Sequence, residues 1–163
     1  MNTTQIIRGS LNKNNLKISS PVRTLSEDLK AGKEKERRLL ELLAQQDLVL
    51  KENRSEGDFS LWDFVDTEGN YYELKSCSVN SIRQLHKTGL MIGANKLQFA
   101  DKNPNFKYTV YYQFPTGIYK FHYTPGDIFK YTLRNFTRTD RGRPESKVYS
   151  WIPIEEFTPI CLI

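Results

Sequence analysis

The sequence predicts an α/β fold with a mixed central β-sheet flanked by helices. Three observations favour this class: a charged segment with leucines at helical spacing comes first, runs rich in aromatic and β-branched residues follow, and a short second helical pattern interrupts them. With 163 residues, 38% of them hydrophobic, the chain is long enough for one packed core and too short for two ordinary ones. We therefore expect one domain over residues 24–163, with an N-terminal arm over residues 1–23 before it and a basic elaboration over about residues 130–163 at its end.

The first element is expected to be a helix over residues 24–46. It opens with a Thr-x-x-Glu capping pattern, and its apolar stripe consists of Leu39, Leu40 and Leu43. Glu36 precedes these leucines by three, four and seven residues, so it should lie on the same face. A carboxylate there is costly unless a metal, a lysine or hydrogen bonds satisfy it, which makes Glu36 a candidate for holding a second metal or its water network. The alternative is a glutamate at the rim that bends out to solvent.

The later elements follow from β-favouring runs, turn residues and one more helical pattern. A polar crossover separates the first group of strands from the second helix, and a Pro-Thr-Gly turn joins the strands of a hairpin. The expected order is strands at 48–50, 61–65 and 71–75, a helix at 92–100, hairpin strands at 106–114 and 118–123, a helical turn or loop from 124–127, and an edge strand at 148–154 that Pro153 ends.

Two carboxylates and one ammonium group are expected to converge on the strands at 61–65 and 71–75. Asp63 and Glu73 lie on runs joined by a tight turn, and Glu73 shares a strand face with Lys75 because side chains alternate. Mg²⁺ prefers oxygen ligands, so Asp63, Glu73 and the backbone carbonyl of Leu74 are candidate ligands for Mg²⁺ or Mn²⁺. Lys75 would orient or deprotonate a water, or stabilise charge on a phosphate. The alternative is a pair of solvent-facing hairpin charges with Lys75 as their salt-bridge partner.

Basic side chains in two parts of the chain are candidate contacts for nucleic acid. The net charge of +5 suits a polyanionic partner, and phosphate contacts give affinity without sequence information. A solvated loop is the alternative for the second group. The first group is Arg83, His86, Lys87 and Lys96, and the second is Arg134, Arg138, Arg141, Arg143 and Lys147, interleaved with Phe136 and Tyr149.

Composition argues against a membrane-bound or secreted protein. No apolar run approaches the roughly 18 residues of a membrane-spanning helix, and the first residues lack the charged start and apolar stretch of a secretory signal. The two cysteines, Cys77 and Cys161, are too few and too scattered for a disulfide framework or a zinc site. We therefore expect an intracellular protein in a reducing compartment.

The order Glu36, Asp63, Glu73-Leu74-Lys75 and Lys96 resembles the PD-(D/E)xK nuclease superfamily, and looks most like the small nucleases of large DNA viruses. The likeness spans residues 30–125, with Trp62 where many members have proline. It implies a restriction-endonuclease-like core, a divalent metal, cleavage of DNA with branched or recombination and repair intermediates among the substrates, and a homodimer for cutting two strands. In a virus it would act in the cytoplasm or nucleus of the host cell. A non-catalytic nucleic-acid-binding protein that keeps the fold, and a nuclease acting on RNA, are the alternatives.

Overall fold

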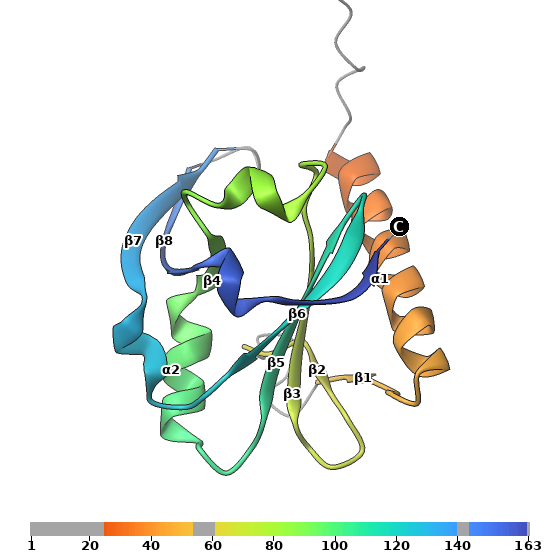
Figure 1. The fold of residues 1–163 in the computed structure, drawn as a ribbon, viewed down its shortest axis with the longest axis horizontal. Coiled ribbons are helices and arrows are strands. Elements are labelled where there is room, and N and C mark those ends of the chain that lie inside the picture. The colour runs from red at the N-terminus through yellow and green to blue at the C-terminus, as the bar shows by residue number, and fades with distance from the viewer. Residues whose placement is uncertain (1–24, 54–60, 140–143, 163) are drawn as a thin grey trace, which may run out of the picture. The chain divides into compact units, whose positions relative to one another are not determined.

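The computed structural model describes residues 25–53, 61–139 and 144–162, so the predicted N-terminal arm lies outside the described part. Contacts divide the chain into two units, Met1–Ala31 and Gly32–Ile163, and the features discussed below belong to the second. The described residues form two sheets and two α-helices in an α/β arrangement, which can be followed in Figure 1. The helices are α1 (Leu25–Gln45) and α2 (Ala94–Lys102), and short 3-10 turns lie at η2 (Ile82–Leu85), η3 (Asp127–Lys130) and η4 (Ile154–Glu156).

The main sheet contains both parallel and antiparallel neighbours. Strand β3 pairs with β5 in parallel, whereas the other neighbouring pairs are antiparallel. The mixed sheet of the sequence prediction is therefore confirmed, as is the hairpin of β5 and β6. In spatial order the strands are β1 (Lys51–Glu52), β2 (Phe64–Val65), β3 (Tyr71–Ser76), β5 (Tyr108–Phe114), β6 (Gly117–Tyr123) and β9 (Thr158–Leu162).

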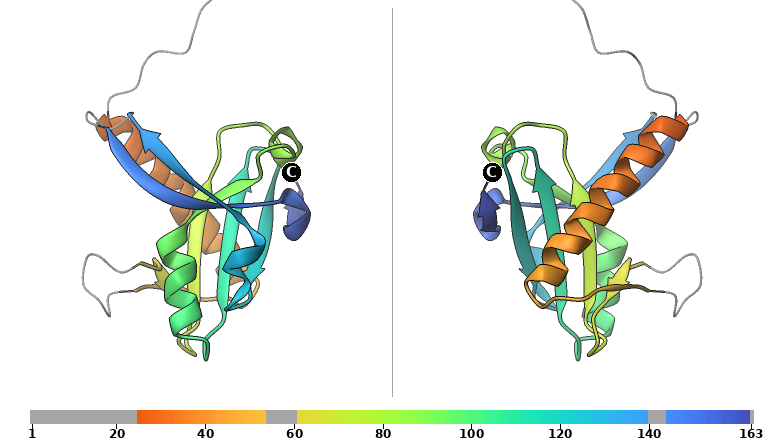
Figure 2. Two further views of the ribbon diagram at one scale, coloured as in Figure 1. Left: turned by 90° about the vertical axis from the view of Figure 1, so that its left-hand side faces the viewer. Right: turned by 90° about the vertical axis from the view of Figure 1, so that its right-hand side faces the viewer.

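A second sheet of three strands stands beside the main one. Its order is β4 (Leu90–Gly93), β8 (Glu145–Ile152) and β7 (Thr132–Arg138), and all its pairs are antiparallel. Figure 2 shows β7 and β8 running together as one long twisted ribbon. Most side chains of this ribbon are exposed, except near the end of β8, where Ser150 and Ile152 are buried.

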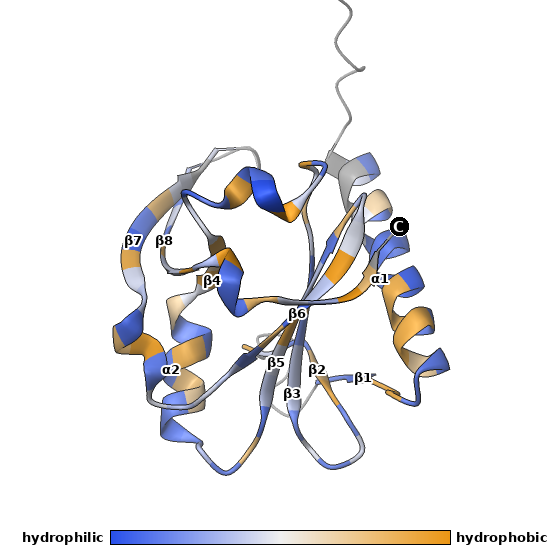
Figure 3. Cartoon of the chain, viewed as in Figure 1, coloured by the Kyte–Doolittle hydropathy of each residue, from blue (hydrophilic) through white to orange (hydrophobic). Residues whose placement is uncertain are grey.

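The main sheet buries different apolar clusters on its two faces. Leu39 and Leu43 of α1 belong to one cluster with Leu74 of β3, whereas Leu97 of α2 belongs to the other with Val110 of β5. Figure 3 shows alternating hydrophilic and hydrophobic segments along α1, as expected for a helix with one apolar face. Since neighbouring strand residues point to opposite faces, the residues on either side of Leu74 point toward the cluster that contains α2.

The predicted flanking by helices holds only in part, because strands cover some of the face that carries α2. Leu90 and Ile92 of β4 and Ile152 of β8 belong to the same cluster as Leu97. No described helix has both the length and the apolar character needed to cross a membrane.

Several predicted element boundaries are wrong. The predicted helix at 92–100 begins at Ala94, because the preceding residues form β4 and pair with β8. Residues 48–50 are not a strand, and the strand there is β1, one residue further along. The predicted edge strand at 148–154 is β8, which begins at Glu145 and lies in the centre of its sheet, although it does end immediately before Pro153. These differences arise from pairings between distant segments, which local sequence patterns do not report.

Candidate functional site

The segment before β2 is held in place by a buried asparagine. The Asn53 backbone N–H donates to the Asp63 carbonyl over 2.8 Å, and its side-chain amide donates to the Trp62 carbonyl over 2.9 Å. Phe64, the first residue of β2, pairs with Tyr72 of β3. Continuing this antiparallel register by one residue places Asp63 opposite Glu73. The local pairing therefore brings together the two carboxylates that the sequence singled out.

These carboxylates line a pocket of about 380 Å³ between the two sheets and α2. The predicted residues Asp63, Glu73, Lys75 and Lys96 all line it. Gly93 and Glu145, which the sequence did not single out for the site, also line it. So do Lys147 and Tyr149, which the sequence placed in the second basic group of expected nucleic-acid contacts.

Glu73 lies at the centre of the charged groups and is only 4% exposed. Its Oε1 lies 3.2 Å from Lys96 Nζ and its Oε2 lies 3.6 Å from Lys75 Nζ. Among the described residues, Oε1 has no hydrogen-bond partner, because the Lys96 ammonium is close enough for an ion pair but poorly aligned for donation. Glu73 thus keeps a buried acceptor available for a cation.

The side-chain carboxyl groups of Asp63 and Glu73 are in contact with each other. Burial, and then the charge and hydrogen bonding of Glu73, raise the pKa of Asp63 to about 6, while Lys96 and Lys75 oppose the shift. The Asp63 residue as a whole is nevertheless exposed, and it lines the pocket. Two carboxylates this close repel each other unless a proton or a cation lies between them.

Lys96 ties α2 to the segment that carries Asp63. Its Nζ donates to the carbonyl of Leu61, and the indole N–H of Trp62 donates to the Lys96 carbonyl over 3.1 Å. The Lys96 side chain is 12% exposed. It was predicted to contact phosphate from its helix, and the structure places its ammonium inside the pocket, paired with Glu73.

Lys147 brings a third ammonium group to the pocket from β8. Burial lowers its pKa, as do the positive charges of Lys96 and Lys75, while Glu73 and Asp63 oppose the shift. Its Nζ comes so close to β4 that a Cβ added at Gly93 would lie 3.2 Å from it. The sequence places Lys147 in the second basic group, and its meeting with Glu73 follows from the pairing of β8 with β4, which joins segments far apart in the chain.

Glu36 lies near this site without lining the pocket, as far as the described residues define it. It is half-buried on α1. Burial raises its pKa, Lys33 opposes the shift, and the charges of Glu52 and Glu73 add to it. The structure therefore places Glu36 within electrostatic range of Glu73.

The Leu74 carbonyl faces the edge of β3 nearest Asp63. The N–H groups of Tyr71 and Cys77 donate to carbonyls on the β5 side, over 2.9 Å each. In a parallel pair, alternate residues direct their backbone groups to the same neighbour. Leu74 is an odd number of residues from both, so its carbonyl points to the β2 side, as a ligand beside Asp63 requires.

The other predicted nucleic-acid contacts are scattered. Arg83 in η2 and the nearby Lys87 are exposed and do not line this pocket. Arg134 on β7 lies over the Trp151 ring, 4.5 Å from its centroid. The side chain of Arg138 lies outside the described part of the chain, as do residues Arg141 and Arg143.

Comparison of the chain with models of protein families, with curated proteins and with solved structures found no match.

Proposed function

We propose that the chain is a divalent-metal-dependent DNA endonuclease that hydrolyses phosphodiester bonds, with a restriction-endonuclease-like core. The observation that carries the proposal is the contact between Asp63 and Glu73 in a pocket that also holds the ammonium groups of Lys75, Lys96 and Lys147. Carboxylates in contact suit a cation, and clustered lysines suit the negative charge of a phosphate. The resemblance to PD-(D/E)xK nucleases supports the same assignment.

The donor groups fit Mg²⁺ or Mn²⁺. Glu73 offers a buried oxygen that has no hydrogen-bond partner within the described part of the chain, Asp63 lies against it, and the Leu74 carbonyl faces the same edge. The described residues contain no group of three or more His, Cys, Asp or Glu side chains placed to hold a metal. Two carboxylates are nevertheless a typical protein contribution to a Mg²⁺ site, which completes its shell with water and substrate phosphate.

Each lysine has a distinct role in this proposal. A bound divalent ion would neutralise charge on the phosphate and make nearby water more acidic. Lys75, 3.6 Å from Glu73 Oε2, orients the attacking water and stabilises the charge that develops at phosphorus. Lys96 holds Glu73 in position through its ion pair, and Lys147 approaches the phosphate from the opposite sheet. The water forms a new P–O bond as the P–O bond to the leaving oxygen breaks, and the proton that the water gives up balances the one that the leaving oxygen takes up.

Cleavage assays on Glu73→Gln and Lys75→Ala test the proposal. Labelled duplex, flap, junction and single-stranded DNA, together with matched RNA, are incubated with Mg²⁺ or Mn²⁺. We expect wild-type chain to cut DNA and each variant to lose about 100-fold or more in rate, because a metal ligand or a charge-stabilising group is missing. Binding in EDTA should survive in both variants.

The controls are exposed residues of matched type away from the pocket, Glu155→Gln and Lys102→Ala, and both should cut at the wild-type rate. Nucleic-acid binding with no cutting in either metal would instead favour a non-catalytic binding protein. If the chain cuts only RNA, the proposed substrate changes from DNA to RNA. Sedimentation of the free chain and of its DNA complex tests the expected homodimer.

A further inference from the structure

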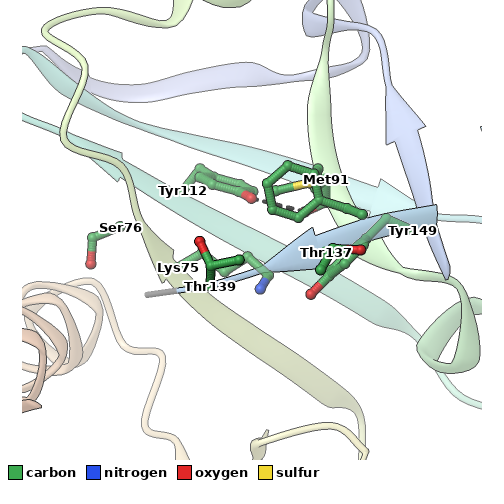
Figure 4. A pocket seen from close by; sticks show the side chains of 8 residues that line it. Lys75, Ser76, Met91, Tyr112, Thr137, Thr139 and Tyr149 are labelled. Atoms are coloured by element: carbon green, nitrogen blue, oxygen red, sulfur yellow. Dashed lines mark hydrogen bonds between the residues drawn. The ribbon is translucent and has the colours of Figure 1, made fainter. Parts of the chain in front are cut away.

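A second pocket, of about 570 Å³, adjoins the proposed active site. Lys75 and Tyr149 line both pockets, so the two cavities share a boundary. Figure 4 shows side chains from β3, β4, β5 and the β7–β8 ribbon around this second pocket, with the Lys75 amine among them. A molecule whose phosphate lies in the first pocket would therefore place the adjoining part of its structure in the second.

Aromatic and hydroxyl-bearing side chains define the second pocket. Tyr112, Phe136 and Tyr149 supply rings, and Thr137 supplies a hydroxyl group. The Tyr112 hydroxyl is already occupied, because it donates to the Met91 carbonyl over 2.9 Å. Among the described lining residues there is no carboxylate, and the charged member is Lys75. Such a site suits a flat, polar-edged ring attached to a phosphate.

Phe136 is the ring best placed to contact a ligand. It lies on β7, at the edge of the second sheet, and is 39% exposed. It meets Tyr149 edge to face, with centroids 6.2 Å apart and planes at 82°, so Tyr149 covers at most one of the two faces of the Phe136 ring. An exposed ring face beside a phosphate-binding group is the arrangement on which nucleobases stack.

We propose that the second pocket binds the nucleobase next to the scissile phosphate, and that this base belongs to an unpaired strand. The inference rests on the proposed function. A base inside a duplex is paired and stacked, so it can enter a side pocket only if the duplex opens locally, which is energetically unfavourable. A base in a single strand, flap or frayed end enters without that cost. The active site accordingly selects single-stranded regions of DNA.

Binding measured in EDTA tests the pocket independently of cleavage. A labelled single strand and its duplex are titrated with wild-type chain and with Phe136→Ala. We expect the substitution to weaken single-strand binding by about 5- to 100-fold, the range for losing one stacked base, and to change duplex binding by less than about twofold. Phe136→Trp should restore single-strand binding because it restores the stacking surface.

Two controls separate stacking from general loss of apolar surface. Leu133→Ala removes an exposed apolar side chain from the same strand, and Phe129→Ala removes an exposed aromatic ring from η3. Neither residue lines the second pocket, and both variants should bind single strands as the wild type does.

A scan with abasic nucleotides locates the base. One base at a time is removed from the single strand, and one position should weaken wild-type binding as much as Phe136→Ala does. In Phe136→Ala the same abasic position should have no further effect, because the two changes remove the same contact. In Mg²⁺, the wild-type chain should cut the strand at the phosphate next to that position.

The outcomes of the two proposals are distinguishable. Base-dependent binding with no cleavage in Mg²⁺ or Mn²⁺ upholds the pocket and contradicts the nuclease. Suppose instead that the chain cuts DNA but Phe136→Ala weakens duplex and single-strand binding equally, or no abasic position weakens binding. Either result contradicts the base-binding pocket and leaves the nuclease proposal intact.

Discussion

Contact between the Asp63 and Glu73 carboxyl groups couples the charge of the site to pH. The pKa of Asp63 is raised to about 6 from its ordinary value of 3.8, first by burial and then by Glu73. Between these two pH values the folded chain holds a proton that the unfolded chain has released. The stabilisation associated with that proton is therefore present at low pH and is lost as pH rises through about 6.

Asp63→Asn should remove this pH dependence. In EDTA, the free energy of unfolding of wild-type chain should fall between about pH 4 and pH 6, and the variant should show a flatter profile. Above pH 6 the variant should be more stable than wild type by roughly 1 kcal/mol, less than the full shift implies because Asp63 remains accessible to solvent. Urea unfolding at several pH values measures the difference. The exposed Asp47→Asn serves as the control, and an equal change in both variants would contradict the assignment.

At the scale of elements, the junction between β4 and α2 positions Lys147. Gly93 ends β4 and precedes α2, and it pairs with Tyr149 of β8. Its φ of −54° is open to any residue, so backbone conformation does not explain the glycine. Limited space explains the glycine, because an added Cβ would lie 2.8 Å from Asn95 Oδ1 and 3.3 Å from Lys147 Cε.

Gly93→Ala should therefore lower cleavage with little loss of fold. The new methyl group moves the Lys147 ammonium away from the phosphate, and losing one charge-assisted contact corresponds to about a 10- to 100-fold loss of rate. In a Lys147→Ala background the same substitution should add almost nothing, because the contact is already gone. Single-turnover cleavage measures both effects. Gly32→Ala, where nothing lies within 4 Å, is the control and should cut normally.

The sequence predicted correctly those features that depend on residues close together in the chain. The leucine spacing of α1 and the turn between β5 and β6 lie within single stretches of sequence, and so does the alternation that places Glu73 beside Lys75. Lys147 was expected to contact nucleic acid but not to join the carboxylate pocket, because β8 reaches the pocket through pairing with β4, about 60 residues earlier in the chain. Strand β7 was missed because its described side chains are exposed on both faces, so it has no apolar alternation.

At the scale of the whole Gly32–Ile163 unit, the site depends on both sheets. The main sheet and the segment before β2 supply Asp63, Glu73 and Lys75, α2 supplies Lys96, and the second sheet supplies Lys147. A ligand that binds these groups together should therefore favour the folded state of the unit as a whole.

Divalent metal should stabilise the folded chain. At a Mg²⁺ or Mn²⁺ concentration about 100 times the Kd, the expected gain is about 2.7 kcal/mol, because only the folded chain brings Asp63 and Glu73 together. Thermal unfolding with and without EDTA measures it. Glu73→Gln should lose the gain, and potassium chloride at matched ionic strength should not reproduce it, because screening acts on all charges alike. An equal rise in melting temperature for wild type and Glu73→Gln would contradict a metal site at these residues.

The positions of the two tryptophans, one just before β2 of the main sheet and one in β8 of the second sheet, give the protein an intrinsic optical probe near each sheet. Trp62 is fully buried beside Asp63 and hydrogen-bonded to α2, whereas Trp151 of β8 lies beneath the Arg134 guanidinium. Indole fluorescence depends on nearby charge and on exposure to water. Metal binding should therefore alter the emission of Trp62, and binding of a DNA strand to the β7–β8 ribbon should alter the emission of Trp151. Trp151→Phe separates the two signals, so both events can be followed in real time without attaching a dye.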